Sequence, residues 1–114
     1  MIHDRSNSEH YFWGDECQGW RLNDSNDPSV IEETMPPGTD EKLHYHQQAF
    51  QFFYILKGTS VSEFDNKEFT VNALQGLSIA PKKVHRISNR SKGDLHFLVI
   101  SQPTTKNDRI NTDL

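Results

Sequence analysis

The alternation of apolar and polar residues along the chain has the short period of β-strands. Residues 29–35 are rich in β-branched side chains and end at the sequence PPG, and residues 51–57 form a strongly apolar run that ends at a glycine. No window of ten or more residues repeats apolar positions at helical spacing. Many short strands separated by Gly, Pro, Asn and Asp predict an all-β sandwich or barrel. The predicted strands are residues 19–22, 29–35, 43–47, 51–57, 59–64, 68–71, 77–80, 84–89 and 95–100.

The two ends of the chain are more polar than its centre. Residues 1–10 form a polar N-terminal segment that we expect to be frayed, and residues 102–114 form a polar tail that we expect to wrap loosely or to be disordered. The predicted barrel therefore spans residues 11–101. A chain of 114 residues suits a single domain, and we expect no repeat and no second domain.

The strand at residues 51–57 is apolar on both of its faces. Phe53 and Ile55 share one face with Gln51, and the opposite face carries Phe52, Tyr54 and Leu56. A strand that is apolar on both sides needs cover on both. The barrel interior covers one face, so the N-terminal aromatic segment or a second subunit must cover the other. We expect a homodimer that buries Phe52, Tyr54 or Leu56.

Composition and charge exclude several classes of partner. The net charge is −4 and no basic cluster is present, which argues against nucleic acid. No apolar run is long enough to span a membrane, and the polar N-terminus lacks the apolar core of a signal peptide. The single cysteine, Cys17, cannot form an internal disulfide. The simplest interpretation is a cytoplasmic protein that contacts neither a membrane nor nucleic acid.

Two histidines one residue apart are the clearest candidates for chemistry. His44 and His46 point to the same face of a strand, so they can act as a bidentate metal clamp whose third ligand comes from elsewhere. Gln51 opens the next strand and His85 opens a later one. If these faces all line one barrel, the metal site is His44, His46, His85 and Gln51. The pair alone also fits two surface histidines, or a set that forms hydrogen bonds inside a barrel without metal.

The spacing around this pair resembles the first motif of the cupin superfamily. That motif is a glycine, five residues, H-x-H, three or four residues, an acid, six residues and a glycine. This chain has Gly38, five residues, His44 and His46 around a tyrosine, four residues, Gln51, six residues and Gly58. Every spacing matches, and the acid is replaced by glutamine.

The second cupin motif, I-P-P-G-x-x-H-x-x-x-N, is similar to residues 79–89. The isoleucine, the second proline, the histidine and the asparagine are present as Ile79, Pro81, His85 and Asn89. The first proline is replaced by alanine, and the glycine by Lys82. A further glycine, expected near the start of the motif, falls at Leu74. The resemblance is to small single-domain cupins, many of them without an assigned reaction.

The resemblance implies a double-stranded β-helix, or jelly-roll barrel, with a divalent transition metal inside it: Zn, Ni, Fe, Cu or Mn. It implies that His44, His46 and His85 are metal ligands. Gln51 occupies the position of a glutamate ligand, where its carbonyl oxygen could coordinate or its amide could bind a water or substrate. Three histidines and a glutamine leave a divalent site at a charge of about +2, which favours an anionic ligand.

Two classes of function follow from the resemblance. One is a metal-dependent enzyme, either a Lewis-acid isomerase or lyase or an oxygenase, acting on a small oxygen-bearing anion. The other is a non-catalytic module that binds or senses a sugar or another metabolite. The absence of an evident acid or base beside the histidines favours the second. Tyr45 and Arg86 are expected to face away from the ligands, and strand parity does not decide which way Glu33 and Glu63 point.

The remaining candidates have simpler explanations. His3, His10 and His96 are expected to be incidental. The aromatic residues at 11–13, together with Trp20, are expected to pack rather than to line a pocket. No catalytic residue is assigned.

Overall fold

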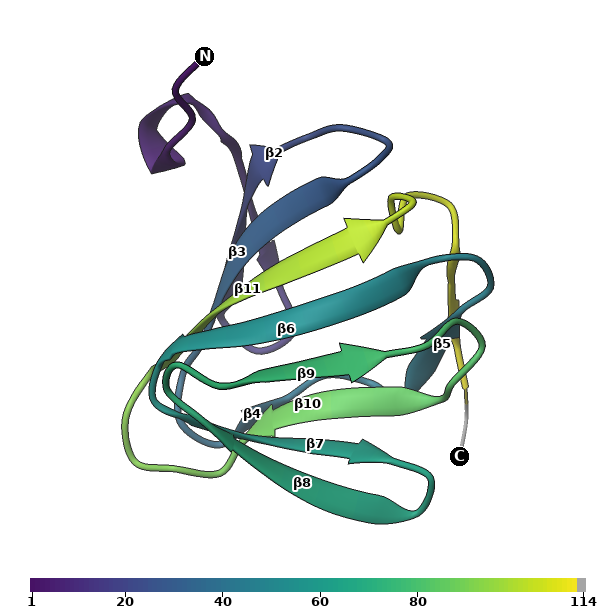
Figure 1. The fold of residues 1–114 in the computed structure, drawn as a ribbon. Helices are drawn as coiled ribbons and strands as arrows, with labels where there is room; N and C mark the ends of the chain where they lie inside the picture. The colour runs from purple at the N-terminus through teal and green to yellow at the C-terminus, as the bar shows by residue number, and fades with distance from the viewer. Residues whose placement is uncertain (113–114) are drawn as a thin grey trace.

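The computed structural model describes residues 1–112, which fold into two antiparallel sheets stacked face to face (Figure 1). The fold is the predicted jelly-roll barrel. One sheet has the order β1-β2-β3-β11-β6-β9 and the other has the order β12-β5-β10-β7-β8, with β4 paired to β10. The strands of the first sheet are β1 (Glu9–Trp13), β2 (Cys17–Asn23), β3 (Ser29–Met35), β6 (Phe50–Lys57), β9 (Gly76–Ile79) and β11 (Leu95–Gln102). Those of the second are β4 (Thr39–Asp40), β5 (His44–His46), β7 (Thr59–Phe64), β8 (Lys67–Asn72), β10 (His85–Asn89) and β12 (Arg109–Asn111).

The core lies between the two sheets and follows the strand alternation of the sequence. In β11, the alternate residues from Leu95 to Ser101 are buried, and the residues between them are half-buried. Phe53 and Ile55 meet this row from β6, with which β11 pairs, and Ile87 meets it from the opposite sheet. Cys17 is also fully buried, and burial raises the pKa of its thiol.

Tight turns connect the strands, and one glycine is required by its geometry. Gly58 is the single residue between β6 and β7, and its φ is +92°. A Cβ at this position would lie 2.7 Å from the Asp94 carbonyl oxygen. Both substituted glycines of the second motif have the same backbone requirement, because Leu74 has φ 66° and Lys82 has φ 69°. These L-residues occupy the left-handed region that favours glycine.

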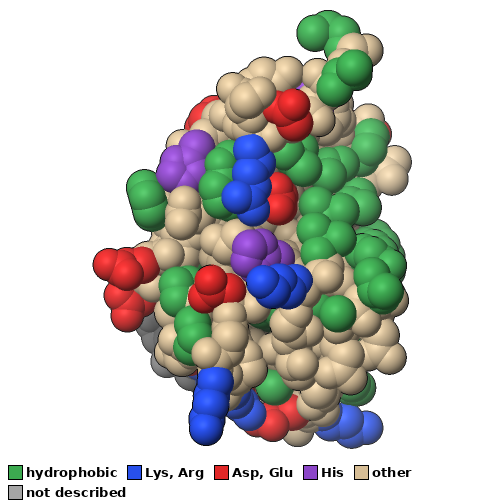
Figure 2. All heavy atoms as spheres, turned by 90° about the vertical axis from the view of Figure 1, so that its left-hand side faces the viewer, with side chains coloured by type: hydrophobic (Ala, Val, Ile, Leu, Met, Phe, Trp, Pro, Cys, Tyr) green, Lys and Arg blue, Asp and Glu red, His purple; other side chains and the backbone are tan. Residues whose placement is uncertain are grey.

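The outer face of β6 is apolar and open. Phe52 and Leu56 are 37% and 39% exposed, Tyr54 is half-buried, and the rings of Phe52 and Tyr54 stack with centroids 6.4 Å apart. Phe52 lies over Gly76, where a Cβ would be only 2.3 Å from the ring. Hydrophobic side chains gather along the right-hand edge of Figure 2, the side that carries the sheet drawn in front in Figure 1. No helix within residues 1–112 has the length and apolar character needed to cross a membrane.

Both polar ends contain regular structure that the sequence pattern did not predict. A short 3₁₀-helix (Arg5–Asn7) precedes β1, which begins at Glu9 and pairs with β2. The expectation of a loose C-terminal tail was wrong for Arg109–Asn111, which form β12 beside β5. Backbone hydrogen bonds to a neighbouring strand hold these polar residues, and hydropathy does not reveal such a neighbour. The expected barrel limits at residues 11 and 101 stay a prediction.

Candidate metal centre

Three histidines converge inside the barrel. β5 carries His44 and His46 on its inward face, and β10 lies beside β5 with His85 directly opposite His44. Each of the three is 4% exposed or less. One ring nitrogen from each can be chosen so that all three lie within 4.8 Å of one another. The ring centroids of His44 and His85 are only 4.4 Å apart.

The histidine rings are held as neutral imidazoles. Nδ1 of His44 lies 2.8 Å from the Lys42 carbonyl oxygen, and Nδ1 of His85 lies 2.7 Å from that of Lys83. A carbonyl can only accept, so each Nδ1 donates and each Nε2 keeps its lone pair. Desolvation lowers the pKa of His44 to about 3 and that of His46 to about 4, and it also lowers the pKa of His85. Neutral imidazoles with available lone pairs are metal donors.

Gln51 lines the same cavity as His44 and His46, but from β6 of the other sheet. It is 5% exposed, and its Nε2 donates a hydrogen bond of 3.3 Å to the Ser101 Oγ, directly across from it on β11. Within residues 1–112 the Gln51 Oε1, the His46 Nδ1 and the His85 Nε2 are buried without a hydrogen-bond partner. Buried polar atoms are rarely left unpaired, and all three belong to the predicted site. The donor set therefore fits a metal ion.

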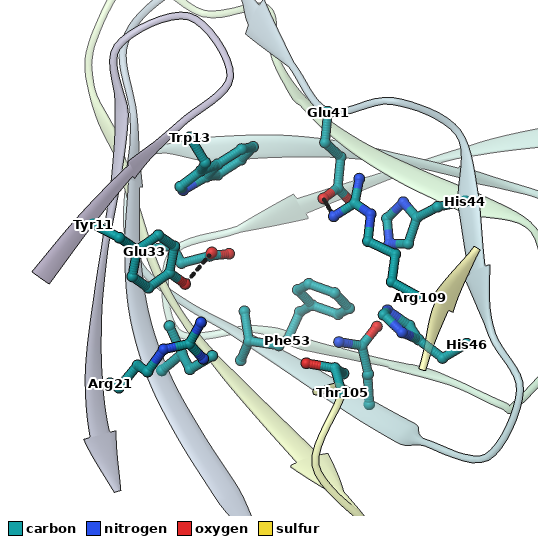
Figure 3. A pocket seen from close by; sticks show the side chains of 13 residues that line it. Tyr11, Trp13, Arg21, Glu33, Glu41, His44, His46, Phe53, Thr105 and Arg109 are labelled. Carbon is teal, nitrogen blue, oxygen red and sulfur yellow. Dashed lines mark hydrogen bonds and ion pairs between the residues drawn. The ribbon is translucent and has the colours of Figure 1, made fainter. Parts of the chain in front are cut away.

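Two of the three histidines, His44 and His46, border a cavity of about 220 Å³ whose opposite wall is built by β1, β2 and β3. Figure 3 shows Tyr11, Arg21 and Glu33 on one side of it, and His44 and His46 on the other. Trp13 also lines the cavity, so the expectation that the aromatic residues at 11–13 only pack was wrong for Tyr11 and Trp13.

A glycine allows the opposite wall to form. Tyr11, Gly19 and Glu33 lie in one row across β1, β2 and β3. The Tyr11 ring occupies the space where a Cβ of Gly19 would be, and its hydroxyl donates a 3.0 Å hydrogen bond to Glu33 Oε2. The Arg21 guanidinium lies 4.8 Å from the centre of the Tyr11 ring, which is a cation–π distance.

Two carboxyl groups face the cavity, and burial favours their protonated forms. Desolvation raises the pKa of Glu33 to about 7 and that of Glu41 to about 8, although the Tyr11 hydroxyl and the Ile87 amide, respectively, stabilise their ionised forms. Glu41 Oε1 accepts a 3.0 Å hydrogen bond from the backbone N–H of Ile87. Groups with such pKa values can exchange protons near neutral pH. Strand parity alone did not place Glu33 in the cavity, and Glu41 was missed because it lies in a loop.

Arg109 and Thr105 complete the lining from the C-terminal segment. Sequence reasoning missed both, because the segment was expected to wrap loosely. The one available signal was the short alternation around Ile110. Figure 3 shows Arg109 beside His44 and His46. The Arg109 guanidinium lies 3.9 Å from Glu41 Oε2.

Other residues considered in the sequence lie elsewhere. Tyr45 and Arg86 alternate with the inward histidines of their strands, and Arg86 forms an ion pair with Glu63 on the surface. His10 and His96 do not line the cavity. The histidine at position 10 instead contacts Gln18 and the ring of Trp20.

Comparison with known families agrees with this architecture. The model of the Cupin domain family matches residues 31–101, more than half of the chain. The chain belongs to the cupin family. The matched segment of this cupin contains the three histidines and Gln51, but neither Tyr11 nor the C-terminal segment.

Individual relatives of this cupin are similar over part of their length. The chain is 33% identical over 75 residues to an uncharacterised protein of Methanocaldococcus jannaschii, covering 66% of this chain and 60% of that protein. It is 32% identical over 66 residues to an oxalate-binding protein of Thermotoga maritima, covering 58% and 54%. The crystal structure of a predicted oxalate decarboxylase from Thermotoga maritima superposes with a TM-score of 0.81 at 24% identity, covering 91% of this chain and all of the other. The last similarity shows the fold alone.

Proposed function

We propose that this cupin holds one divalent transition metal ion through His44, His46 and His85, with Gln51 as the fourth group, and binds a small oxygen-bearing anion there. The observation that carries the proposal is that one ring nitrogen from each of three buried, neutral imidazoles lies within 4.8 Å of the other two, beside the cavity that His44 and His46 line. Imidazole-rich sites suit Zn, Ni, Cu and Fe, and Mn is a weaker candidate. The bound metal would supply Lewis-acid chemistry to an oxygen ligand.

The class of ligand follows from size and charge. A cavity of about 220 Å³ admits only a small molecule. The three histidines and Gln51 add no negative charge, so a divalent ion would keep a charge of about +2, and Arg109 adds a further positive charge nearby. An anion with at least one carboxylate complements such a site. The similarity to an oxalate-binding protein supports the same class of ligand.

The metal proposal is tested by elemental analysis of the purified protein and of His46→Ala. We expect about one metal ion per chain in the wild type. In His46→Ala the affinity for the metal should be at least a hundredfold weaker, and its content in the purified protein correspondingly lower, because one of three strong donors is lost. His10→Ala removes an exposed histidine outside the cavity and serves as the matched control. Full occupancy in a folded His46→Ala protein would refute the ligand assignment.

Proton-transfer chemistry is a second candidate function, favoured by the wall opposite the histidines. The Glu33 carboxyl faces the cavity and accepts a hydrogen bond from Tyr11, so an acid–base group lies across from the metal site. An isomerase or lyase needs such a group to move a proton, whereas a passive binding module does not.

A labelling experiment separates the enzyme from the binding module. The metal-loaded protein is incubated in D₂O with a panel of small 2-oxo and 2-hydroxy acids, and deuterium incorporation is followed by NMR. Deuterium incorporation by the wild type that is absent in Glu33→Gln would support the isomerase or lyase. Binding without exchange would support the module, and oxygen consumption would indicate the oxygenase.

We also propose that two copies associate through the outer face of β6. Phe52, Tyr54 and Leu56 form an open apolar row there, and large exposed apolar patches mark interaction surfaces. Light scattering at micromolar concentration is expected to give the dimer mass for the wild type and the monomer mass for Phe52→Asp. A wild-type monomer would refute this proposal without affecting the metal site.

A further inference from the structure

The C-terminal segment lies directly against the histidine strand. β12 pairs with β5 in antiparallel register, with Arg109 opposite His46 and Asn111 opposite His44. Residues opposite each other in an antiparallel pair project to the same face of the sheet. Arg109 therefore projects to the side on which His46 lines the cavity, as Figure 3 shows.

The positive charge of Arg109 is only loosely compensated. Within residues 1–112 its guanidinium forms one hydrogen bond, from Nε to the Asn111 Oδ1 at 2.9 Å, and one long ion pair of 3.9 Å to Glu41. Glu41 already accepts the Ile87 N–H, and burial raises the pKa of its carboxyl to about 8, which disfavours the charged form that would pair with Arg109. A guanidinium has five N–H donors in a planar fork that matches a carboxylate, and most of these donors stay available.

An aspartate next to Arg109 clamps the segment to the loop that follows His46. Both oxygens of the Asp108 carboxylate accept hydrogen bonds of 2.9 to 3.1 Å from the backbone N–H groups of residues 47, 48 and 49. Hydrogen bonds to a carboxylate are stronger than neutral ones. The backbone N–H of Thr112 donates to the Leu43 carbonyl oxygen at 2.9 Å, so the segment is attached at both ends of β5.

We propose that Arg109 recognises the carboxylate of the ligand and that Asp108 positions it, so that the C-terminal segment is part of the binding site. The inference rests on the proposed function, because it assumes an anion bound at the histidine centre. Arg109 is the specificity-determining residue, and Asp108 is a positioning residue that acts through the loop after His46. Neither lies in the segment matched by the family model, which ends at residue 101.

Isothermal titration of the zinc-loaded protein with oxalate and with oxamate tests the role of Arg109. Oxamate replaces one carboxylate of oxalate by a neutral amide. We expect Arg109→Gln to weaken oxalate binding at least tenfold and to reduce the preference for oxalate over oxamate, with unchanged zinc content. Arg109→Lys keeps the positive charge but not the planar fork of donors, so it should lose less oxalate affinity than Arg109→Gln. Arg90→Gln is the matched control, since Arg90 is exposed and pairs with Glu63 and Glu68 outside the cavity.

The outcomes separate the inference from the proposed function. Equal oxalate affinity in the wild type and in Arg109→Gln would overturn the inference and leave the metal-bound anion intact. A zinc-loaded wild type that binds neither ligand would overturn the anion-binding function, and the inference with it. A wild type that takes up no zinc would refute the metal centre itself.

Hydrogen exchange tests the clamp independently of any ligand. In Asp108→Asn, backbone amides of residues 47–49 and 109–111 should exchange at least tenfold faster, while those of β11 keep their protection. Oxalate affinity should fall together with this loss of protection. Unchanged exchange at residues 47–49 would show that Asp108 does not hold the segment.

Discussion

Replacing Gln51 by glutamate changes one charge of the proposed metal centre at nearly constant shape. Gln51 is buried, its Nε2 donates to Ser101, and its Oε1 has no partner within the described chain. In Gln51→Glu, the Ser101 hydroxyl can donate to the new carboxylate instead of accepting, so the serine stays paired. The substitution also restores the acid expected from the first motif.

The expected effect is large because the position is shielded from water. Two unit charges about 4 Å apart interact by about 4 kcal/mol at an effective dielectric constant of about 20, and a divalent ion doubles this value. Desolvation of the buried carboxylate offsets several kcal/mol. We therefore expect metal affinity to rise at least tenfold, which corresponds to about 1.4 kcal/mol. The net charge of the centre falls by one unit, so oxalate should bind at least tenfold more weakly.

Competition against a chromophoric zinc chelator measures the first effect, and calorimetry with oxalate measures the second. Gln75→Glu adds the same charge at an exposed position outside the cavity, where the new carboxylate can still accept the Asn72 N–H, and is the matched control. Metal and oxalate affinities that both stay within twofold of the wild type in Gln51→Glu would refute the placement of the Gln51 amide at the metal.

Three further predictions concern stability. The fully buried side chain of Asn89 donates to the carbonyl oxygens of Met35 and Gly93 and accepts from the Ser91 N–H and hydroxyl. Asn89→Asp places a carboxylate against the two carbonyl oxygens, so urea unfolding at pH 7 should show a loss of about 3 kcal/mol in the free energy of unfolding. A loss below about 1 kcal/mol would contradict this prediction. Leu74→Gly should raise the free energy of unfolding by about 0.5–1 kcal/mol, and thus Tm by a few degrees, because glycine relieves the strain of a φ of 66°. Leu74→Ala should leave the stability unchanged, and equal gains in the two variants would disprove the strain. Because the pKa of His44 falls from 6.5 to about 3 on folding, the metal-free protein should lose stability as pH drops from about 6.5 toward 4, since the unfolded chain then binds a proton that the folded one does not. His44→Gln should reduce the dependence of the free energy of unfolding on pH, as measured by urea titrations. An unchanged dependence would refute the lowered pKa of His44.

The strands were largely predictable because their signal is local. The predicted range 29–35 coincides with β3, and 59–64 coincides with β7. The strands at residues 9–13, 39–40 and 109–111 were missed, since they are short or polar and are held by backbone pairing to a neighbour. Hydropathy reports which side chains are buried, not which backbones are paired.

The sequence by itself predicted the all-β class and the shared face of His44 and His46, and its resemblance to the second cupin motif implied His85 as their distant partner. These conclusions depend on the alternation of side chains along one strand and on the spacing of residues, and both follow directly from the order of amino acids.

Only the tertiary structure decided what lies across the cavity from the histidines. Parity gives the two faces of Glu33's strand but not which face is inward, and it cannot reveal that Tyr11 reaches Glu33 over Gly19. Nor can it reveal that a polar tail pairs with β5 and brings Arg109 beside His46. Each of these contacts joins residues far apart in the sequence, and the order of strands in the two sheets sets them.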